Sequence, residues 1–159
     1  NCFFGLKLIH FKSRRMLAAF FDNFFSIVDL MTINKLISVL LQWVSLNTNY
    51  DISKFDSTVK IVNERVIQKL VCGGKCPVLA FYSQKTGILI TNMDLDNFCN
   101  QSILLHEMIH SFQVNKNMEN AFKEKEAYQL QNKFLEEMST INGIVKILNV
   151  KRCRSYQMN

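Results

Sequence analysis

The sequence predicts an α+β fold, in which helices come first, a few short strands follow and further helices complete the chain. Two observations favour this class. Apolar residues recur at helical spacing towards both ends of the chain, and short β-prone runs are confined to its middle. Because these strands do not alternate regularly with helices, their order indicates α+β rather than an α/β fold.

The expected elements are separated by one strong break, the Gly-Gly-Lys-Cys-Pro sequence at 73–77. Thr32 and Asn63 are suitable N-caps for the helices that follow them. Two β-prone runs joined by a polar turn at 83–86 predict a small antiparallel β-hairpin. The expected elements are helices at 16–29 and 31–46, a strand at 58–62, a helix at 63–71, strands at 78–82 and 87–91, and helices at 102–114, 120–138 and 144–150.

The chain of 159 residues is long enough for one domain with its own core. We expect this domain to span residues 31–150, with residues 1–30 as an N-terminal extension and residues 151–159 as a basic C-terminal tail. Aromatic side chains such as Phe20 and Phe24 would pack as core or as an oligomer interface. Charged residues interrupt the N-terminal apolar stretch, so we expect no transmembrane segment, and the stretch favours neither export nor the cytoplasm.

The net charge of +6 arises at the two ends of the chain. Residues 1–15 and 144–159 each contain four basic and no acidic residues, whereas residues 16–143 contain 11 basic and 13 acidic ones. A nucleic-acid-binding protein carries its basic residues as a stripe across the folded surface, and the sequence indicates no such stripe. We therefore expect no nucleic-acid partner.

The five cysteines lack CxxC spacing, which argues against a zinc–cysteine cluster. Cys72 and Cys76 flank the tight-turn sequence Gly-Gly-Lys. They would form a disulfide in an oxidising compartment and would remain thiols in a reducing one. The sequence leaves both states open.

The chemically informative segment is an HExxH motif, formed by His106, Glu107 and His110. On a helix, positions four apart share one face, so the two histidines can bind one Zn²⁺ while Glu107 reaches the water beside the metal. Apolar neighbours place this helix in the core, where imidazoles need a partner. Gln113 shares the ligand face, where it either supports a ligand or simply ends the helix. The motif predicts a zinc site with Glu107 as the catalytic residue.

A catalytic zinc ion has three protein ligands and an open position for water. Since no histidine follows His110, we expect a glutamate as the third ligand. Glu126 is favoured, because the 16 residues after His110 allow a turn and an antiparallel second helix. Phe122 and Leu130 would flank it on the buried side of that helix. Glu124 is the weaker placement, and the other candidates are Glu119, Glu136 and Glu137.

With this glutamate, the chain resembles the gluzincin class of zinc peptidases in a minimal form, and more narrowly a small bacterial family of HExxH metallopeptidases. The resemblance covers about residues 31–137 and has no counterpart for residues 1–30. The matching segments are Trp43 with 48–51, Cys72 with Cys76, 88–90, 102–113 and 124–131. The resemblance implies a zincin-like fold, in which His106, His110 and Glu126 bind one Zn²⁺ and Glu107 is the general base.

These features predict zinc-dependent hydrolysis of peptide bonds, with a peptide or protein as the substrate. Zinc would activate a water molecule and polarise the scissile carbonyl, while Glu107 would transfer the proton to the leaving nitrogen. The strand expected at 87–91 would pair with an extended substrate. Two alternatives stay open: a non-catalytic zinc-stabilised binding domain, and an all-helical interaction protein in which the motif is accidental.

Overall fold

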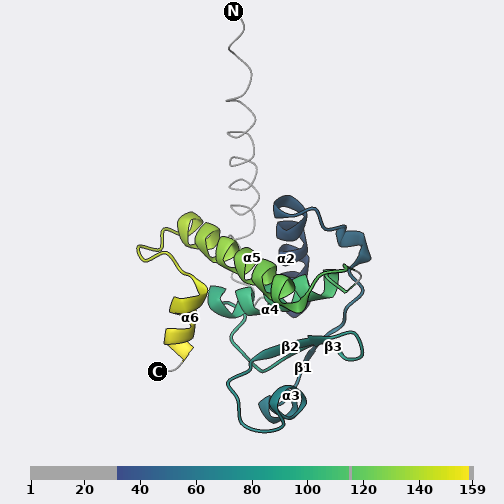
Figure 1. Cartoon of the computed structure of the whole chain (residues 1–159). Helices are drawn as coiled ribbons and strands as arrows, with labels where there is room; N and C mark the ends of the chain where they lie inside the picture. Colours follow the sequence, from purple (N-terminus) through teal and green to yellow (C-terminus); the bar gives the residue numbers. More distant parts are fainter. Residues whose placement is uncertain (1–31, 115, 158–159) are drawn as a thin grey trace, which may run out of the picture. The chain divides into compact units, whose positions relative to one another are not determined.

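The computed structural model describes residues 32–114 and 116–157, which form an α+β fold with a three-stranded mixed sheet (Figure 1). The class expected from the sequence is therefore confirmed. The elements are α2 (Ile33–Asn47), the 3₁₀ helix η1 (Ile52–Lys54), β1 (Val59–Ile61), α3 (Glu64–Cys72), β2 (Ala80–Ser83), β3 (Gly87–Ile90), α4 (Phe98–Phe112), α5 (Asn120–Ile141) and α6 (Val150–Gln157). The helix expected at 16–29 and the aromatic N-terminal stretch lie outside the described residues.

Three helices begin at side chains that cap their first turn. Thr32 and Asn63 each accept a hydrogen bond from a backbone N–H of the helix that follows, as the sequence predicts. Helix α4 begins at Phe98, earlier than the expected Ser102, because Asn97 caps it through the N–H of Cys99. The earlier start adds a full turn in front of the histidines.

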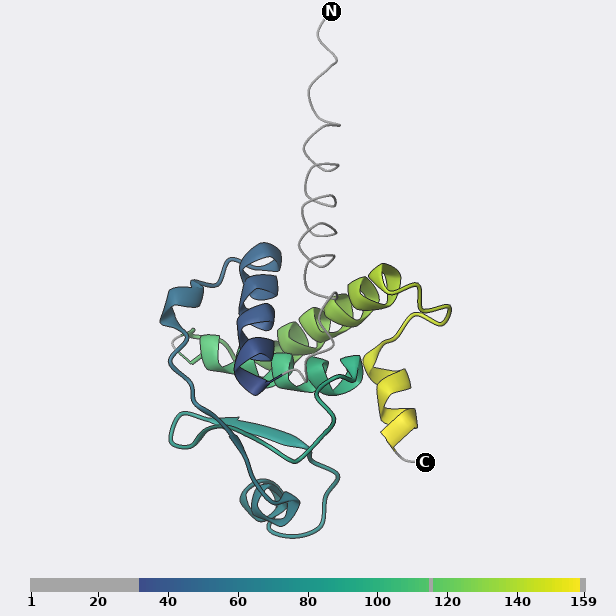
Figure 2. The ribbon, with the colours of Figure 1, turned by 180° about the vertical axis from the view of Figure 1, so that it is seen from behind.

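Strand β3 is the centre of the sheet, parallel to β1 and antiparallel to β2. The expected hairpin is thus present, and the parallel pairing of β1 completes the sheet. Helix α4 covers one face and α3 the other (Figures 1 and 2), so the consecutive residues Ile88, Leu89 and Ile90, which alternate between the two faces, are all buried. The expectation that the strand at 87–91 pairs with a substrate is wrong, because both of its edges are occupied.

Gly87 allows β1 to approach the start of β3. Its φ of +74° lies in the left-handed region, and a Cβ atom there would lie 2.6 Å from the backbone oxygen of Thr58. That oxygen accepts a hydrogen bond of 2.9 Å from the N–H of Ile88. Any larger residue at this position would push β1 away from the sheet.

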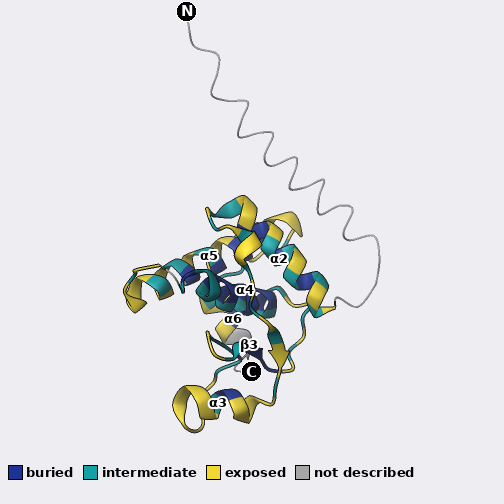
Figure 3. Ribbon diagram, turned by 90° about the vertical axis from the view of Figure 1, so that its right-hand side faces the viewer, coloured by how far each residue is buried: buried dark blue, intermediate teal, exposed yellow. Residues whose placement is uncertain are grey.

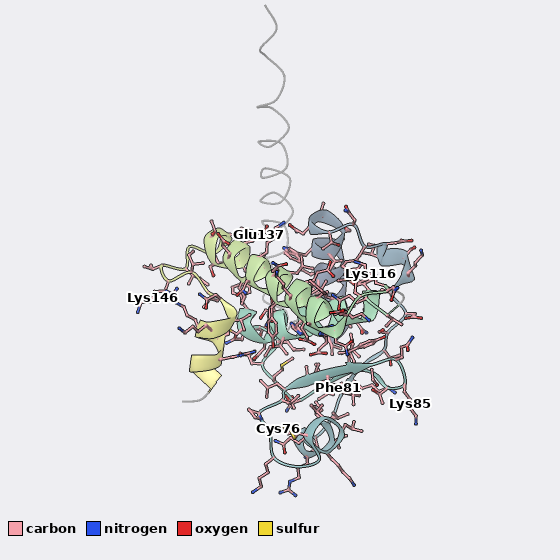
Figure 4. The ribbon with its side chains drawn as sticks, viewed as in Figure 1. Cys76, Phe81, Lys85, Lys116, Glu137 and Lys146 are labelled. Carbon is pink, nitrogen blue, oxygen red and sulfur yellow. A yellow bond between two sulfur atoms is a disulfide. The ribbon has the colours of Figure 1, made fainter. Side chains whose placement is uncertain are left out.

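Helix α4 lies between α5 and the sheet, and Figure 3 shows it as the most continuously buried helix. Helix α2 contacts α5 through Trp43. The ring of Trp43 meets that of Phe134 edge to face, with centroids 5.6 Å apart, and its indole N–H donates to Glu137 at 2.7 Å. Figure 4 labels Glu137 on α5. These contacts fix α5 in position over α4.

Two expectations about the C-terminal segment, a helix at 144–150 and a basic tail at 151–159, are wrong. Residues 144–149 are not helical, and the last helix runs instead over Val150–Gln157, because Asn149 caps it through the N–H of Arg152. Most of the expected basic tail at 151–159 is therefore a folded helix. A disulfide joins Cys153 on this helix to Cys99 in the first turn of α4.

Cys72 and Cys76, which the sequence left open, form a second disulfide at the end of α3. Both disulfides lie within the part of the chain that is described. No helix in that part is long and apolar enough to cross a membrane.

Candidate metal centre

Three side chains from α4 and α5 converge on one point: His106, His110 and Glu124. The Nε2 atoms of the two histidines lie 3.0 Å apart. The carboxylate of Glu124 lies 3.5 Å from Nε2 of His106 and 3.2 Å from Nε2 of His110. Within residues 32–114 and 116–157, this is the one group of three side chains suited to hold a metal ion.

Glu126, the glutamate that the sequence favours, lies apart from this group. Its carboxylate accepts hydrogen bonds of 2.8 Å from the hydroxyl of Tyr50 and from the side-chain amide of Gln113. It also pairs with Lys116 at 3.6 Å, in the turn between α4 and α5 (Figure 4). The structure therefore corrects the third candidate ligand from Glu126 to Glu124.

The reason for the correction is the orientation of α5. Phe122, which the sequence places beside Glu126 on the buried face, is 57% exposed. The buried residues of the helix are Ala127, Gln131, Phe134, Leu135, Met138 and Ser139. Glu124 precedes Gln131 by two helical turns and so shares its face, which points at α4.

Hydrogen bonds determine which nitrogen of His106 carries the proton. Its Nδ1 lies 3.2 Å from the side-chain oxygen of Gln131. The amide nitrogen of Gln131 donates to the hydroxyl of Ser102 at 3.0 Å, and this hydroxyl donates to the carbonyl of Cys99. Because the serine hydrogen is already used, the amide oxygen must be the atom that faces the imidazole. Nδ1 is therefore the donor, and Nε2 carries a lone pair.

The same arrangement recurs at His110. Its Nδ1 lies 2.8 Å from the side-chain oxygen of Gln113. The amide nitrogen of Gln113 donates to the carbonyl of Lys123 at 3.0 Å and to Glu126 at 2.8 Å, and both of these groups can only accept. The amide oxygen therefore accepts from Nδ1 of His110, which leaves a lone pair on Nε2 when the imidazole is neutral.

With both imidazoles neutral, as metal binding requires, the centre gathers acceptor atoms around a small volume. Burial, followed by the charge of His110, lowers the pKa of His106 to about 4, so this imidazole is neutral at pH 7. Acceptors that face one another repel unless a cation lies between them. Zinc bonds of about 2.0–2.2 Å in a tetrahedral site set ligand atoms about 3.3–3.6 Å apart. The two distances from Glu124, which end on different carboxylate oxygens, are 3.2 and 3.5 Å, and the 3.0 Å between the imidazoles would have to widen slightly to admit the ion.

Glu107 lies beside this group without belonging to it. Burial raises the pKa of Glu107 to about 7, and the charge of Glu124 adds to the shift. The backbone N–H of Tyr82 in β2 donates to the carboxylate and opposes the shift. A carboxylate whose pKa lies near neutrality can both take and return a proton.

Two further residues of the site follow Glu124 on α5 and were not singled out from the sequence. Tyr128 and Gln131 come four and seven residues later, at the spacing of one helix face. The ring of Tyr128 lies 4.6 Å, centroid to centroid, from that of His106. Choosing Glu124 as the ligand would have identified both residues by their spacing alone.

A family model matches residues 30–155, a range that contains the metal-centre residues, Glu107 and most of α6. No curated protein and no solved structure matches the chain. The match begins close to residue 31, where the sequence predicts that the domain starts. The chain belongs to the family described as a domain of unknown function, DUF6647.

Proposed function

We propose that the chain is a zinc-dependent peptidase in which His106, His110 and Glu124 hold the metal and Glu107 is the general base. The observation that carries the proposal is the convergence of two imidazole Nε2 atoms and a carboxylate within 3.0–3.5 Å. Three ligands with a fourth position open are typical of catalytic zinc. The side chain of Glu124 is 53% exposed, so water and substrate can reach this point.

The chemistry divides between the metal and the residues of the chain. A bound Zn²⁺ would lower the pKa of a water molecule and polarise the carbonyl of the scissile bond. Glu107, which lies beside the metal-binding group, would accept a proton from the attacking water and return it to the leaving nitrogen. Gln131 and Gln113 would keep the two imidazoles oriented through their Nδ1 atoms.

A peptide is the proposed substrate because a strand edge adjoins Glu107. Strand β2 bonds to β3 on one side only, and the N–H of Tyr82 is directed towards Glu107 on the other. An extended peptide can add to such an edge through backbone hydrogen bonds. This pairing would bring a peptide carbonyl next to the general base, and it moves the expected substrate strand from β3 to β2.

The variant Glu107→Gln tests the proposal. Zinc content is measured by elemental analysis of protein purified without added metal, and cleavage of a peptide library is followed by mass spectrometry. We expect one zinc ion per chain in the wild type and the variant, and a loss of cleavage of at least about 100-fold in the variant. Glu136→Gln, which changes an exposed glutamate of α5, is the matched control and should keep both properties.

Two results would overturn the proposal: cleavage by Glu107→Gln at the wild-type rate, or the absence of zinc from the wild-type protein. Bound zinc without cleavage by the wild type would favour the non-catalytic zinc-stabilised domain instead.

A further inference from the structure

A tyrosine beside the metal centre has no role in the proposed function. Tyr128 lies one turn after Glu124 on α5, and its ring contacts that of His106 with centroids 4.6 Å apart. The residue is 36% exposed, so a ligand in solution can reach it. A molecule bound at the metal would therefore lie next to this side chain.

Arg154 on α6 approaches the same tyrosine. Its Nη2 donates to the hydroxyl oxygen of Tyr128 at 2.9 Å, and the guanidinium carbon lies 5.5 Å from the ring centroid. Because the hydroxyl accepts this bond, its own hydrogen can be donated elsewhere, and no acceptor for it occurs in the described residues. In the same part of the chain, no carboxylate forms an ion pair with Arg154.

The fold holds Arg154 in this place from both neighbouring helices. The adjacent Cys153 is 4% exposed and is bonded to Cys99 in α4. At the start of α6, the N–H of Val150 donates to the side chain of Asn132 on α5 at 2.9 Å. Helix α6, which carries the arginine, is thus anchored to both helices that supply the metal-centre residues.

The C-terminal segment that contains α6 carries charge of a single sign. Residues 138–159 contain four basic and no acidic residues. One of them, Lys146, lies in the loop before α6 (Figure 4). At the centre itself, a divalent cation would balance the charges of Glu124 and of an ionised Glu107, so the positive charge comes from this segment. An anionic group would be attracted to the space between the metal and α6.

We infer that Tyr128 and Arg154 bind a carboxylate of the substrate, so that the site prefers peptides with a carboxylate near the cleaved bond. The inference rests on the proposed function. A guanidinium binds a carboxylate through two parallel hydrogen bonds, and the phenolic hydroxyl supplies a third donor. The carboxylate comes from a peptide C-terminus or from an acidic side chain, which present the same chemistry.

Ligand binding to the zinc-loaded full chain tests the inference without turnover. Succinic acid monohydroxamate and its neutral primary amide both chelate zinc, and they differ only in the carboxylate at the far end. By calorimetry we expect the wild type to bind the acid at least about tenfold more tightly than the amide. Arg154→Gln should reduce this ratio to about one, and Tyr128→Phe should lower it in part.

Lys151→Gln is the matched control, because it removes one positive charge from an exposed position of the same helix. It should keep the wild-type ratio. A wild-type ratio near one, or an unchanged ratio in Arg154→Gln, would overturn the inference. Zinc retained with neither hydroxamate bound would also overturn it, whereas a protein that holds no zinc would overturn the proposed function itself.

Peptide substrates then distinguish the two sources of the carboxylate. One pair differs in a free or amidated C-terminus, and a second pair differs in an internal Glu or Gln. We expect kcat/KM to fall at least about tenfold on neutralising one of these carboxylates, and Arg154→Gln should remove that difference. Equal rates within both pairs, in a wild-type protein that cleaves them, would contradict the inference.

Discussion

Glu126 accepts a hydrogen bond of 2.8 Å from the side-chain amide of Gln113. Glu124 is only two residues away on α5, but it points to another side of the helix and faces the two histidines instead. The oxygen of the same amide faces Nδ1 of His110 at 2.8 Å. The charge of Glu126 therefore orients the amide, and the amide orients the imidazole. We expect Glu126 to act on the metal centre indirectly, through Gln113. Glu124 should act on it directly, as a ligand.

Zinc affinity should separate the two glutamates. Glu124→Gln removes a candidate ligand, so we expect affinity to fall by more than about 100-fold. Glu126→Gln leaves the three candidate ligands in place and removes only the charge that orients Gln113. We therefore expect zinc affinity to fall about tenfold in this variant. Both values are measured by competition with a chromogenic zinc chelator.

Glu136→Gln is the control for this pair, since it removes the same charge from an exposed position of α5 and should leave zinc affinity unchanged. A larger loss in Glu126→Gln than in Glu124→Gln would return Glu126 to the ligand set.

Tyr50 connects the metal centre to the loop after α2. Its hydroxyl donates to Glu126 at 2.8 Å, and its ring stacks on Phe112 with centroids 5.1 Å apart. Tyr50→Phe keeps the stacked ring and removes one hydrogen bond to a charged group, so the free energy of unfolding should fall by about 1–2 kcal/mol in urea titrations. An unchanged value would mean that water replaces the hydroxyl without loss.

Local signals in the sequence were sufficient for most of the fold. Capping side chains and apolar spacing predicted α2 and α3, and the polar turn at 83–86 predicted the hairpin of β2 and β3. The convergence of His106 and His110 also followed from helix geometry alone, because four residues make about one turn. Each of these features depends on residues that are close together in the chain.

Features that depend on packing were not predicted. The choice between Glu124 and Glu126 is set by the rotation of α5 about its axis, which Trp43 and other distant side chains help to fix. The apolar Phe122 indicated the wrong face because it is exposed. The pairing of Cys99 with Cys153, which turns the expected tail into a docked helix, joins residues 54 positions apart and leaves no local signal.

Because Glu107 is buried, we expect the stability of the metal-free protein to depend on pH. Its folded pKa is raised from 4.5 to about 7, so between these values the folded chain keeps a proton that the unfolded chain has released. Stability should therefore fall as the pH rises through this interval. Since glutamine cannot ionise, chelator-treated Glu107→Gln should be more stable than the wild type at pH 8 by on the order of 1–3 kcal/mol.

Urea titrations at pH 4.5 and pH 8 provide the comparison for Glu107→Gln. The free energy of unfolding should differ little between variant and wild type at pH 4.5, and the variant should be the more stable of the two at pH 8. A gain of the same size at both values would show that ionisation of Glu107 is not its cause.

The two disulfides should differ in what they contribute to stability. Cys99–Cys153 closes a loop with a sequence separation of 54, whereas Cys72–Cys76 closes one with a separation of 4. From the chain entropy that each bond removes from the unfolded state, we expect the first to stabilise the fold by about 4 kcal/mol and the second by about 2 kcal/mol. We expect Cys99→Ala with Cys153→Ala to lower the urea midpoint more than Cys72→Ala with Cys76→Ala.

Alkylation tests whether both bonds form. The chain has five cysteines, four of which are paired in the structure, so iodoacetamide should add at most one label to the unfolded, unreduced protein and five after reduction. Because Arg154 follows Cys153 directly, loss of that bond should also release the arginine from Tyr128. A double variant that lacks Cys99 and Cys153 but keeps wild-type stability would show that packing alone holds α6 in place.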